Sequence, residues 1–335
     1  MAESGVAVVI GLLVGALLML TFGYDPIRAY AALFSGAFGS TAGILESLAF
    51  ATPLMVTAVT FAVGVRAALF NIGAEGQMYI GAMGAIIVGG AILLPAGVHP
   101  IAATIVAMCV GALWALPAAV LKVWRGVHEV VSTIMLNWIA FWFVTYLIRT
   151  YFAEPGRAER AVPALRTARY AIIGETLTTM IIVVAVLCIA VTILLWRTGI
   201  GFELRLVGDN PEAAKYAGAS GSRAILTSFL VGGLAAGLAG ATQVLGRPPS
   251  WTIYATLGNL LNLGFDGIGV ALIGRNHPIG GIFAAIFYGG LMHGGRFMEY
   301  NVGVASELVD AINGIIVIAL AIPEVVAIIR RRRES

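Results

Sequence analysis

Long apolar runs separated by short polar segments constrain the fold of this chain more than any other feature. Each run approaches the roughly 20 residues that one helix needs to cross the hydrocarbon core of a bilayer. Soluble domains usually carry about 25% charged residues, whereas this chain of 335 residues is 11% charged and 60% hydrophobic. The sequence therefore predicts an all-α polytopic membrane protein with a single transmembrane domain over residues 1–335. About ten spans are expected, at roughly 4–23, 47–67, 72–94, 100–121, 129–150, 175–196, 224–245, 257–274, 278–295 and 305–329.

The placement of arginine and lysine predicts the orientation of these spans. With the N-terminus in the cytoplasm, the inner ends of the spans hold twelve basic residues and the outer ends hold eight. Basic residues are enriched on the cytoplasmic side of membrane proteins, and the run 330–333 directly follows the last span. We therefore expect both termini in the cytoplasm, the loop 151–174 outside and the loop 197–223 inside. The arginines of 151–174 oppose this assignment, so their position outside needs another reason.

Motifs for common enzyme chemistry are missing. Lys122 and Lys215 are the only lysines, and neither lies in the G-x-x-x-x-G-K-[ST] loop that binds nucleotide phosphates. His128-Glu129 lacks the second histidine of H-E-x-x-H, and no G-x-S-x-G elbow is present. We expect no catalytic residue, no metal site and no cofactor in this chain, and no nucleic acid as a partner.

A turn followed by a short helix is predicted inside the loop 197–223. Asp209 or Asn210 can cap the helix, Pro211 suits its first position, and Glu212 favours the positive end of the helix dipole. Two interpretations stay open at this point. The segment is either an ordinary capped loop helix or a lever that docks into another subunit.

An acid and an amide stand at the start of the apolar stretch "ALFNIGAEGQMYIGAMGAIIVGG". Asn71 is predicted to cap the helix, Glu75 lies in its first turn, and Gly73 permits a break before it. A charge at the bilayer centre costs roughly 2.5–3.5 kcal/mol on insertion scales, so Glu75 must avoid lipid. It is either part of a capped helix start or, with Gln77, near a transport pathway.

Polar residues also recur at helical spacing inside later apolar runs. Thr133 and Asn137 are four residues apart, and Asn259, Asn262 and Asp266 follow at spacings of three and four. They either bond neighbouring helices together or line a pathway. The predicted pathway residues are Asn71, Glu75, Gln77, Thr133, Asn137, Asn259, Asn262 and Asp266.

Small residues at four-residue spacing predict closely packed helices. One such stripe is Gly81, Ala85 and Gly89, and another is Gly233 and Gly237 with Ala241. Faces of this kind let two helix backbones approach each other closely in a membrane.

Several segments resemble one family of transport proteins. Glu212, Ala213, Ala214 and Gly218 match the E-A-A-x-x-x-G coupling sequence of ABC importer permeases. The I-x-L-P continuation is absent here, which is typical of the branched-chain amino acid and ribose group of these permeases. "LFNIGAEGQMYIGA", "HEVVSTIMLNWIA" and "GFDGIGVALIG" resemble signatures of the nucleoside or simple-sugar branch of that group.

The resemblance implies an ABC importer permease-type fold that forms half of a transmembrane pathway for nucleosides in a bacterial or archaeal inner membrane. It also implies an ATP-binding subunit that holds ATP and magnesium, a second related permease expected to form a heterodimer, and an extracytoplasmic substrate-binding protein. Alternative substrates are simple sugars and branched-chain amino acids. From other classes, an ATP-independent secondary transporter or channel and a non-transporting scaffold stay open. The implied ATPase-coupling residues are Gly208, Asp209, Asn210, Pro211, Glu212, Ala213, Ala214 and Gly218.

The resemblance implies a role for the arginines of the external loop 151–174. A binding protein that delivers substrate must dock transiently, and complementary charge steers such encounters. We expect some of Arg157, Arg160, Arg166 and Arg169 to meet acidic groups on that protein.

Overall fold

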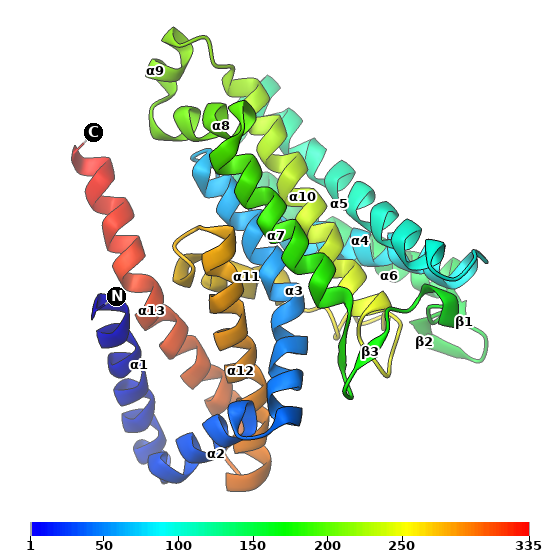
Figure 1. The fold of residues 1–335 in the computed structure, drawn as a ribbon, viewed down its shortest axis with the longest axis vertical. Coiled ribbons are helices and arrows are strands. Elements are labelled where there is room, and N and C mark those ends of the chain that lie inside the picture. The colour runs from blue at the N-terminus through cyan, green and yellow to red at the C-terminus, as the bar shows by residue number, and fades with distance from the viewer. Residues whose placement is uncertain (1, 335) are drawn as a thin grey trace.

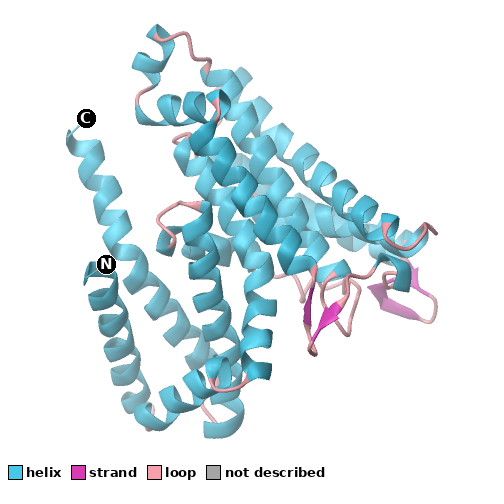
Figure 2. Ribbon diagram, viewed as in Figure 1, coloured by secondary structure: helices cyan, strands magenta, loops and turns pink. Residues whose placement is uncertain are grey.

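The chain forms helices over most of its length, and its few strands lie at one end of the molecule. The computed structural model describes the backbone of residues 2–334 and the side chains of residues 9–320. Figure 2 shows the strands confined to one region. The helices are α1 (Ala2–Thr21), α2 (Pro26–Phe38), α3 (Thr41–Arg66), α4 (Ala74–Ala91), α5 (Val98–Arg125), α6 (Glu129–Tyr151), α7 (Met180–Arg197), α8 (Gly199–Asp209), α9 (Pro211–Tyr216), α10 (Gly221–Leu245), α11 (Leu263–Ile273), α12 (Pro278–Val302) and α13 (Ser306–Glu334). The strands are β1 (Ala153–Glu154), β2 (Arg157–Ala161), β3 (Ile172–Ile173) and β4 (Leu177–Thr178), with a 3-10 helix, η1, at Arg166–Ala168.

The structure does not confirm the predicted number of membrane spans. In the part of the chain that the structure describes, five helices are long and apolar enough to cross a membrane: α3, α5, α6, α7 and α10. The count is six if α11 and α12, which meet at a bend of 116°, form one span. The polytopic helical class is therefore confirmed, whereas the count of ten is not. Helix α4 carries Glu75 and Gln77 and is not among the five, and α1 supplies only a shorter apolar stretch, Val9–Thr21.

Two opposite ends of the helical bundle carry the features that matter for function. Figure 1 shows α8, α9 and the C-terminus at one end, and the β-hairpins at the other. We call these the α9 end and the β end. The helices α1, α2 and α13 form one flank (Figure 1), and α4, α5 and α10 pack closely against one another, with α10 also against α3.

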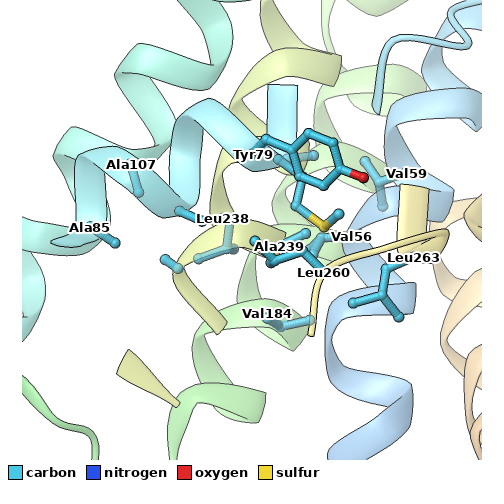
Figure 3. Close-up of a cluster of buried hydrophobic side chains, with 14 of the residues drawn as sticks. Val56, Val59, Tyr79, Ala85, Ala107, Val184, Leu238, Ala239, Leu260 and Leu263 are labelled. Carbon is cyan, nitrogen blue, oxygen red and sulfur yellow. The ribbon is translucent and has the colours of Figure 1, made fainter. Parts of the chain in front are cut away.

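Small residues allow α4, α5 and α10 to pack closely, as the sequence predicts. A Cβ added at Gly81 of α4 would lie 2.5 Å from the Cα of Gly237 in α10. A Cβ added at Gly237 would lie 2.3 Å from the carbonyl oxygen of Ala107 in α5. Backbones at such distances leave no room for a side chain. Figure 3 shows part of the apolar core, to which Ala85 of α4, Ala107 of α5 and Leu238 of α10 contribute.

The predicted helix over 257–274 is wrong in its first third, because α11 begins only at Leu263. Before it, Leu257 and Asn262 have φ angles of +54° and +68°. An L-residue with positive φ cannot continue a right-handed helix. Residues 246–262 therefore run irregularly from the end of α10 to the start of α11. The apolar leucines of this segment gave no sign of the break.

The segment 153–178 folds into two short hairpins, and its first part is bonded to the irregular segment 246–262. Strands β1 and β2 pair antiparallel, as do β3 and β4. The amide of Ala161 donates to the carbonyl of Ile253 at 2.9 Å, and the amide of Ala255 donates to the carbonyl of Glu159 at 2.8 Å. These bonds fix the two segments to each other at the β end.

Candidate functional site

Glu75 joins two helices that begin inside the bundle. The residue is 2% exposed. Its Oε1 accepts from the amide of Asn262 at 2.6 Å and from the hydroxyl of Tyr79 at 2.5 Å, and its Oε2 accepts from the amide of Gly264 at 2.6 Å. The first amides of a helix lack partners within the helix and form its positive end. The carboxylate thus binds the start of α11, which explains how a charge is tolerated here.

Amide side chains stabilise the start of α4 in the same region. Asn137 of α6 accepts from the amide of Gly76 at 2.9 Å and donates to the carbonyl of Ile72 at 2.9 Å. Asn71 accepts from the amide of Gly73 at 3.0 Å and from Nε2 of Gln77 at 3.3 Å. The prediction that Asn71 caps α4 is wrong, because Gly73 is the N-cap. The amide of Asn137, supplied by another helix, takes over part of the capping.

Five of the eight predicted pathway residues thus meet in one buried junction. Thr133 completes it, since its hydroxyl donates to the carbonyl of Glu129 at 2.7 Å and its Cβ would lie 3.2 Å from a Cβ at Gly73. The sequence did not indicate that Glu129 also takes part. Its carboxylate accepts from Lys122 at 2.7 Å and from the amide of Phe70 at 3.3 Å. These contacts favour the helix-packing interpretation, and a pathway role for the junction residues stays a prediction. The junction residues are Asn71, Glu75, Gln77, Thr133 and Asn137.

The other three predicted pathway residues line cavities. Asn259 lines a cavity of ≈ 380 Å³, the Arg247 cavity. Asn262 and Asp266 line a cavity of ≈ 560 Å³, the Asp266 cavity. Asp266 accepts from the hydroxyl of Tyr288 at 2.8 Å. Asn259 donates to the carbonyl of Thr252 at 3.0 Å, so its amide also orders the irregular segment.

Shared residues join these two cavities with a third one. The third, the α2–α12 cavity, has ≈ 890 Å³ and lies between α2, α3 and α12. It shares Glu46 and Phe50 with the Arg247 cavity. The Arg247 and Asp266 cavities share Leu261 and Met292. Arg296 lines all three, so the cavities adjoin one another in the region between Gly174 to Thr176, near the β end, and Asp266 in the first turn of α11.

Two arginines and one aromatic ring stand where the cavities meet. The guanidinium carbons of Arg247 and Arg296 lie 4.4 Å and 4.7 Å from the ring centroid of Phe50. Cations at this distance are attracted to the face of an aromatic ring. Arg247 also donates to the carboxylate of Glu46 at 2.8 Å. The sequence did not reveal this cluster, since its members lie on separate segments. Its one local sign is Arg247 between an apolar helix and Pro248-Pro249.

The short helix predicted inside the loop 197–223 is present as α9, and its role in coupling stays a prediction. Asn210 is its N-cap and accepts from the amide of Ala213 at 3.0 Å, and Pro211 is its first residue. Ala214 is 1% exposed and packs against Val207 and Ala224. The remaining face is open. The exposed residues are Asp209, Asn210, Pro211, Glu212, Ala213, Lys215, Tyr216, Ala217 and Gly218.

The C-terminal end of α8, which leads into α9, is in contact with the end of α3. A Cβ added at Gly208 would lie 2.1 Å from the carbonyl oxygen of Arg66, the last residue of α3. The Arg66 side chain in turn donates to the carbonyls of Asn276 at 3.1 Å and Arg275 at 3.2 Å. A displacement of α8 and α9 would therefore reach both α3 and the turn between α11 and α12.

The predicted docking arginines differ in their surroundings. Arg160 forms an ion pair with Glu154, and Arg169 lies over the ring of Trp251 with its guanidinium carbon at 4.9 Å from the centroid. The hydrogen bond from Arg160 lowers the pKa of the Glu154 carboxyl and raises the pKa of Arg160. Arg157 and Arg166 are exposed. These two arginines therefore offer the more accessible charge at the β end.

Metal chemistry receives no support from the described part of the chain. Within those residues, no group of three or more histidine, cysteine, aspartate or glutamate side chains is arranged to hold a metal ion. The two cysteines, Cys109 and Cys188, are free thiols.

Comparisons with known proteins give a consistent result. The family described as "Branched-chain amino acid transport system / permease component" matches residues 43–321. The chain is 37% identical to the guanosine ABC transporter permease protein NupP of Bacillus subtilis, over 94% of this chain and 91% of that protein. It is 33% identical to the nucleoside ABC transporter permease protein NupB of Lactococcus lactis, over 96% and 91% of the two chains. It is 31% identical to the glucose ABC transporter permease protein TsgB13 of Haloferax volcanii, over 95% and 86%. No solved structure matches the chain.

Proposed function

Because the chain belongs to the family of branched-chain amino acid transport system permease components, we propose that it forms half of the transmembrane pathway of an ABC importer for nucleosides. The observation that carries the substrate class is the 37% identity to a guanosine permease over 94% of the chain. The glucose permease at 31% identity favours a simple sugar as the second candidate.

A permease component of an ABC transporter is a transport subunit and not an enzyme. Hydrolysis of ATP belongs to a separate ATP-binding subunit, which would supply both the nucleotide and its magnesium ion. We further propose that a second, related permease completes the pathway as a heterodimer, and that an extracytoplasmic binding protein delivers the substrate.

The chain is a multi-pass inner-membrane protein, and its orientation is part of the proposal. We assign the α9 end to the cytoplasm, together with both termini and the coupling loop 197–223, and the external loop 151–174 to the other side. Residues 1–335 would then form a single transmembrane permease domain of a bacterial or archaeal cell. The basic residues at the α9 end, among them Arg66, Arg197 and Arg275, support this assignment.

Transport would start at the β end. The exposed charges of Arg157 and Arg166 would attract acidic groups of the binding protein, with Arg160 and Arg169 beside them. The released substrate would enter the connected cavities and pass Arg296 toward Asp266. The geometry supports this route, since the three cavities share lining residues along it.

The exposed face of α9 is suited to contact the ATP-binding subunit. A push on Glu212 and its neighbours would act through Gly208 on the end of α3, and through Arg66 on the turn that follows α11. The start of α11 is held by Glu75, so the junction is where such a movement would meet the pathway. Alternating access would follow from shifts of packed helices.

Reconstitution tests the proposal. The chain, a related permease and the ATP-binding subunit are placed in proteoliposomes with the binding protein, and uptake of labelled guanosine, glucose and leucine is measured. We expect uptake of guanosine that requires ATP. Uptake of guanosine by the single chain without ATP would support a secondary transporter instead. Uptake of glucose without uptake of guanosine would instead assign a simple sugar as the substrate.

A further inference from the structure

We propose that the Asp266 cavity is a subsite for neighbouring hydroxyl groups of the transported solute, with Asp266 and Asn313 as hydrogen-bond acceptors. This inference rests on the proposed function and deepens it, because it assigns the sugar part of a nucleoside to a defined place in the pathway.

The cavity has a suitable size and position. It lies between α11, α12 and α13, which are neighbours in Figure 1. Its volume of ≈ 560 Å³ falls within the range of pockets that hold small organic ligands. Asp266 is in the first turn of α11, and a helix rises about 1.5 Å per residue, so its Cα lies roughly 10 Å along the helix from Ile273, the residue at the other end of α11.

Asn313 is the observation that points to a ligand. The residue lines the cavity and is only 8% exposed. Its Nδ2 donates to the carbonyl of Leu291 at 3.4 Å, while its Oδ1 is buried with no hydrogen-bond partner among the described residues. A buried acceptor without a partner destabilises the state that contains it. A solute that donates a hydroxyl would supply that partner.

Asp266 is arranged to accept from a donor as well. Tyr288 binds its Oδ1 and so fixes the direction of the carboxylate. An ionised carboxylate has about four acceptor positions, so it can accept further hydrogen bonds beside that one. Neighbouring hydroxyl groups, as on a ribose ring, present two donors side by side, which fits one carboxylate and one amide oxygen on facing helices.

The charge of the cavity defines which solutes fit. Glu299 and Asp310 line it together with Asp266, and Arg296 lines it where it meets the Arg247 cavity. Carboxylates repel phosphate groups and accept hydrogen bonds from hydroxyls. The cavity therefore suits a neutral nucleoside better than its phosphorylated form.

The test compares two solutes that differ only in these hydroxyls. Uptake of guanosine and of 2′,3′-dideoxyguanosine, which lacks the two neighbouring ribose hydroxyls and keeps the 5′-hydroxyl, is measured in the complete reconstituted importer below saturation. The variants are Asp266→Asn, which keeps the shape and the bond from Tyr288, and Asn313→Ala. Matched controls are Asp25→Asn and Asn301→Ala, two exposed positions that do not line the cavity. The binding protein is the same throughout, so its own preference cancels in the comparison.

We expect guanosine uptake to fall about tenfold in each cavity variant, since a hydrogen bond to a charged or buried acceptor is lost. Dideoxyguanosine uptake should fall less than about twofold, because that solute never made the bond. An equal loss for both solutes, with normal complex assembly, would overturn the subsite and leave the proposed function intact. A wild-type importer that takes up a different solute and no guanosine would remove the proposed function, and this inference with it.

Discussion

Replacing Glu75 by glutamine should destabilise the protein strongly, although the two side chains have nearly the same shape. The two carboxylate oxygens of Glu75 accept three hydrogen bonds, from the amides of Asn262 and Gly264 and the hydroxyl of Tyr79. A glutamine side chain has one oxygen and can accept only some of these bonds. Its NH₂ group would face an amide N–H of the α11 start, so one donor opposes another. The loss of a charge-assisted bond costs about 1.5–3 kcal/mol and the stranded donor about 1–3 kcal/mol. Because Glu75 is 2% exposed, solvent screens little of this effect.

We therefore expect a loss of roughly 2.5–6 kcal/mol in the free energy of unfolding, the sum of these two ranges. At about 2 °C per kcal/mol, the lower end of the scaling known for large domains, that corresponds to a fall in Tm of roughly 5–12 °C. The assay is thermal unfolding of the purified protein in detergent, with the exposed Glu175→Gln as a control. A Glu75→Gln protein as stable as the wild type would refute the reasoning. Normal stability with lost transport would instead assign Glu75 to the pathway.

Three further predictions concern the two ends and the centre of the bundle. Glu212→Lys should reduce co-purification of the ATP-binding subunit and uncouple ATP hydrolysis from uptake without lowering Tm, since the residue is exposed; unchanged coupling would count against docking at α9. Replacing the exposed Arg157 and Arg166 by glutamate should raise the binding-protein concentration needed for half-maximal uptake, most strongly at low salt. An unchanged half-maximal concentration in this variant would contradict docking at these arginines. Gly81→Leu should abolish stable folding, because its Cβ would lie 2.5 Å from the Cα of Gly237, and overpacking costs about 1–3 kcal/mol or more; detergent-extracted protein with a wild-type Tm would contradict the close contact.

Local patterns in the sequence were sufficient where the physics is local. Apolar length predicts most of the long helices, and Asn210 with Pro211 predicts the start of α9, because capping depends on residues a few positions apart. The stripe at Gly81 predicts close packing for the same reason, since small residues allow it whatever the partner helix is.

The sequence failed where distant segments decide the outcome. Asn71 has the side chain of an N-cap, but Asn137 from α6 binds the start of α4 instead. The backbone amides that bind Glu75 lie 187 and 189 positions further along the chain. They belong to an irregular segment and the helix start after it, and the side chains there are as apolar as those of a membrane helix. No spacing rule connects residues so far apart.

The cluster at the meeting point of the cavities illustrates the same limit. Phe50, Arg247 and Arg296 come from three segments, and each alone fits an ordinary span end. Only their convergence shows that the two cations share one ring. Arginines counted only for membrane orientation thus also contribute to a candidate pathway.

The most direct test of the account is the side of the membrane on which α9 lies. Tyr216, which is 92% exposed, is replaced by cysteine in a chain whose Cys109 and Cys188 are changed to alanine. An impermeant maleimide is then applied to intact and to permeabilised cells, and a crosslinker is applied to the assembled transporter. We predict labelling only after permeabilisation, and a crosslink from position 216 to the ATP-binding subunit. Labelling of intact cells would contradict the account.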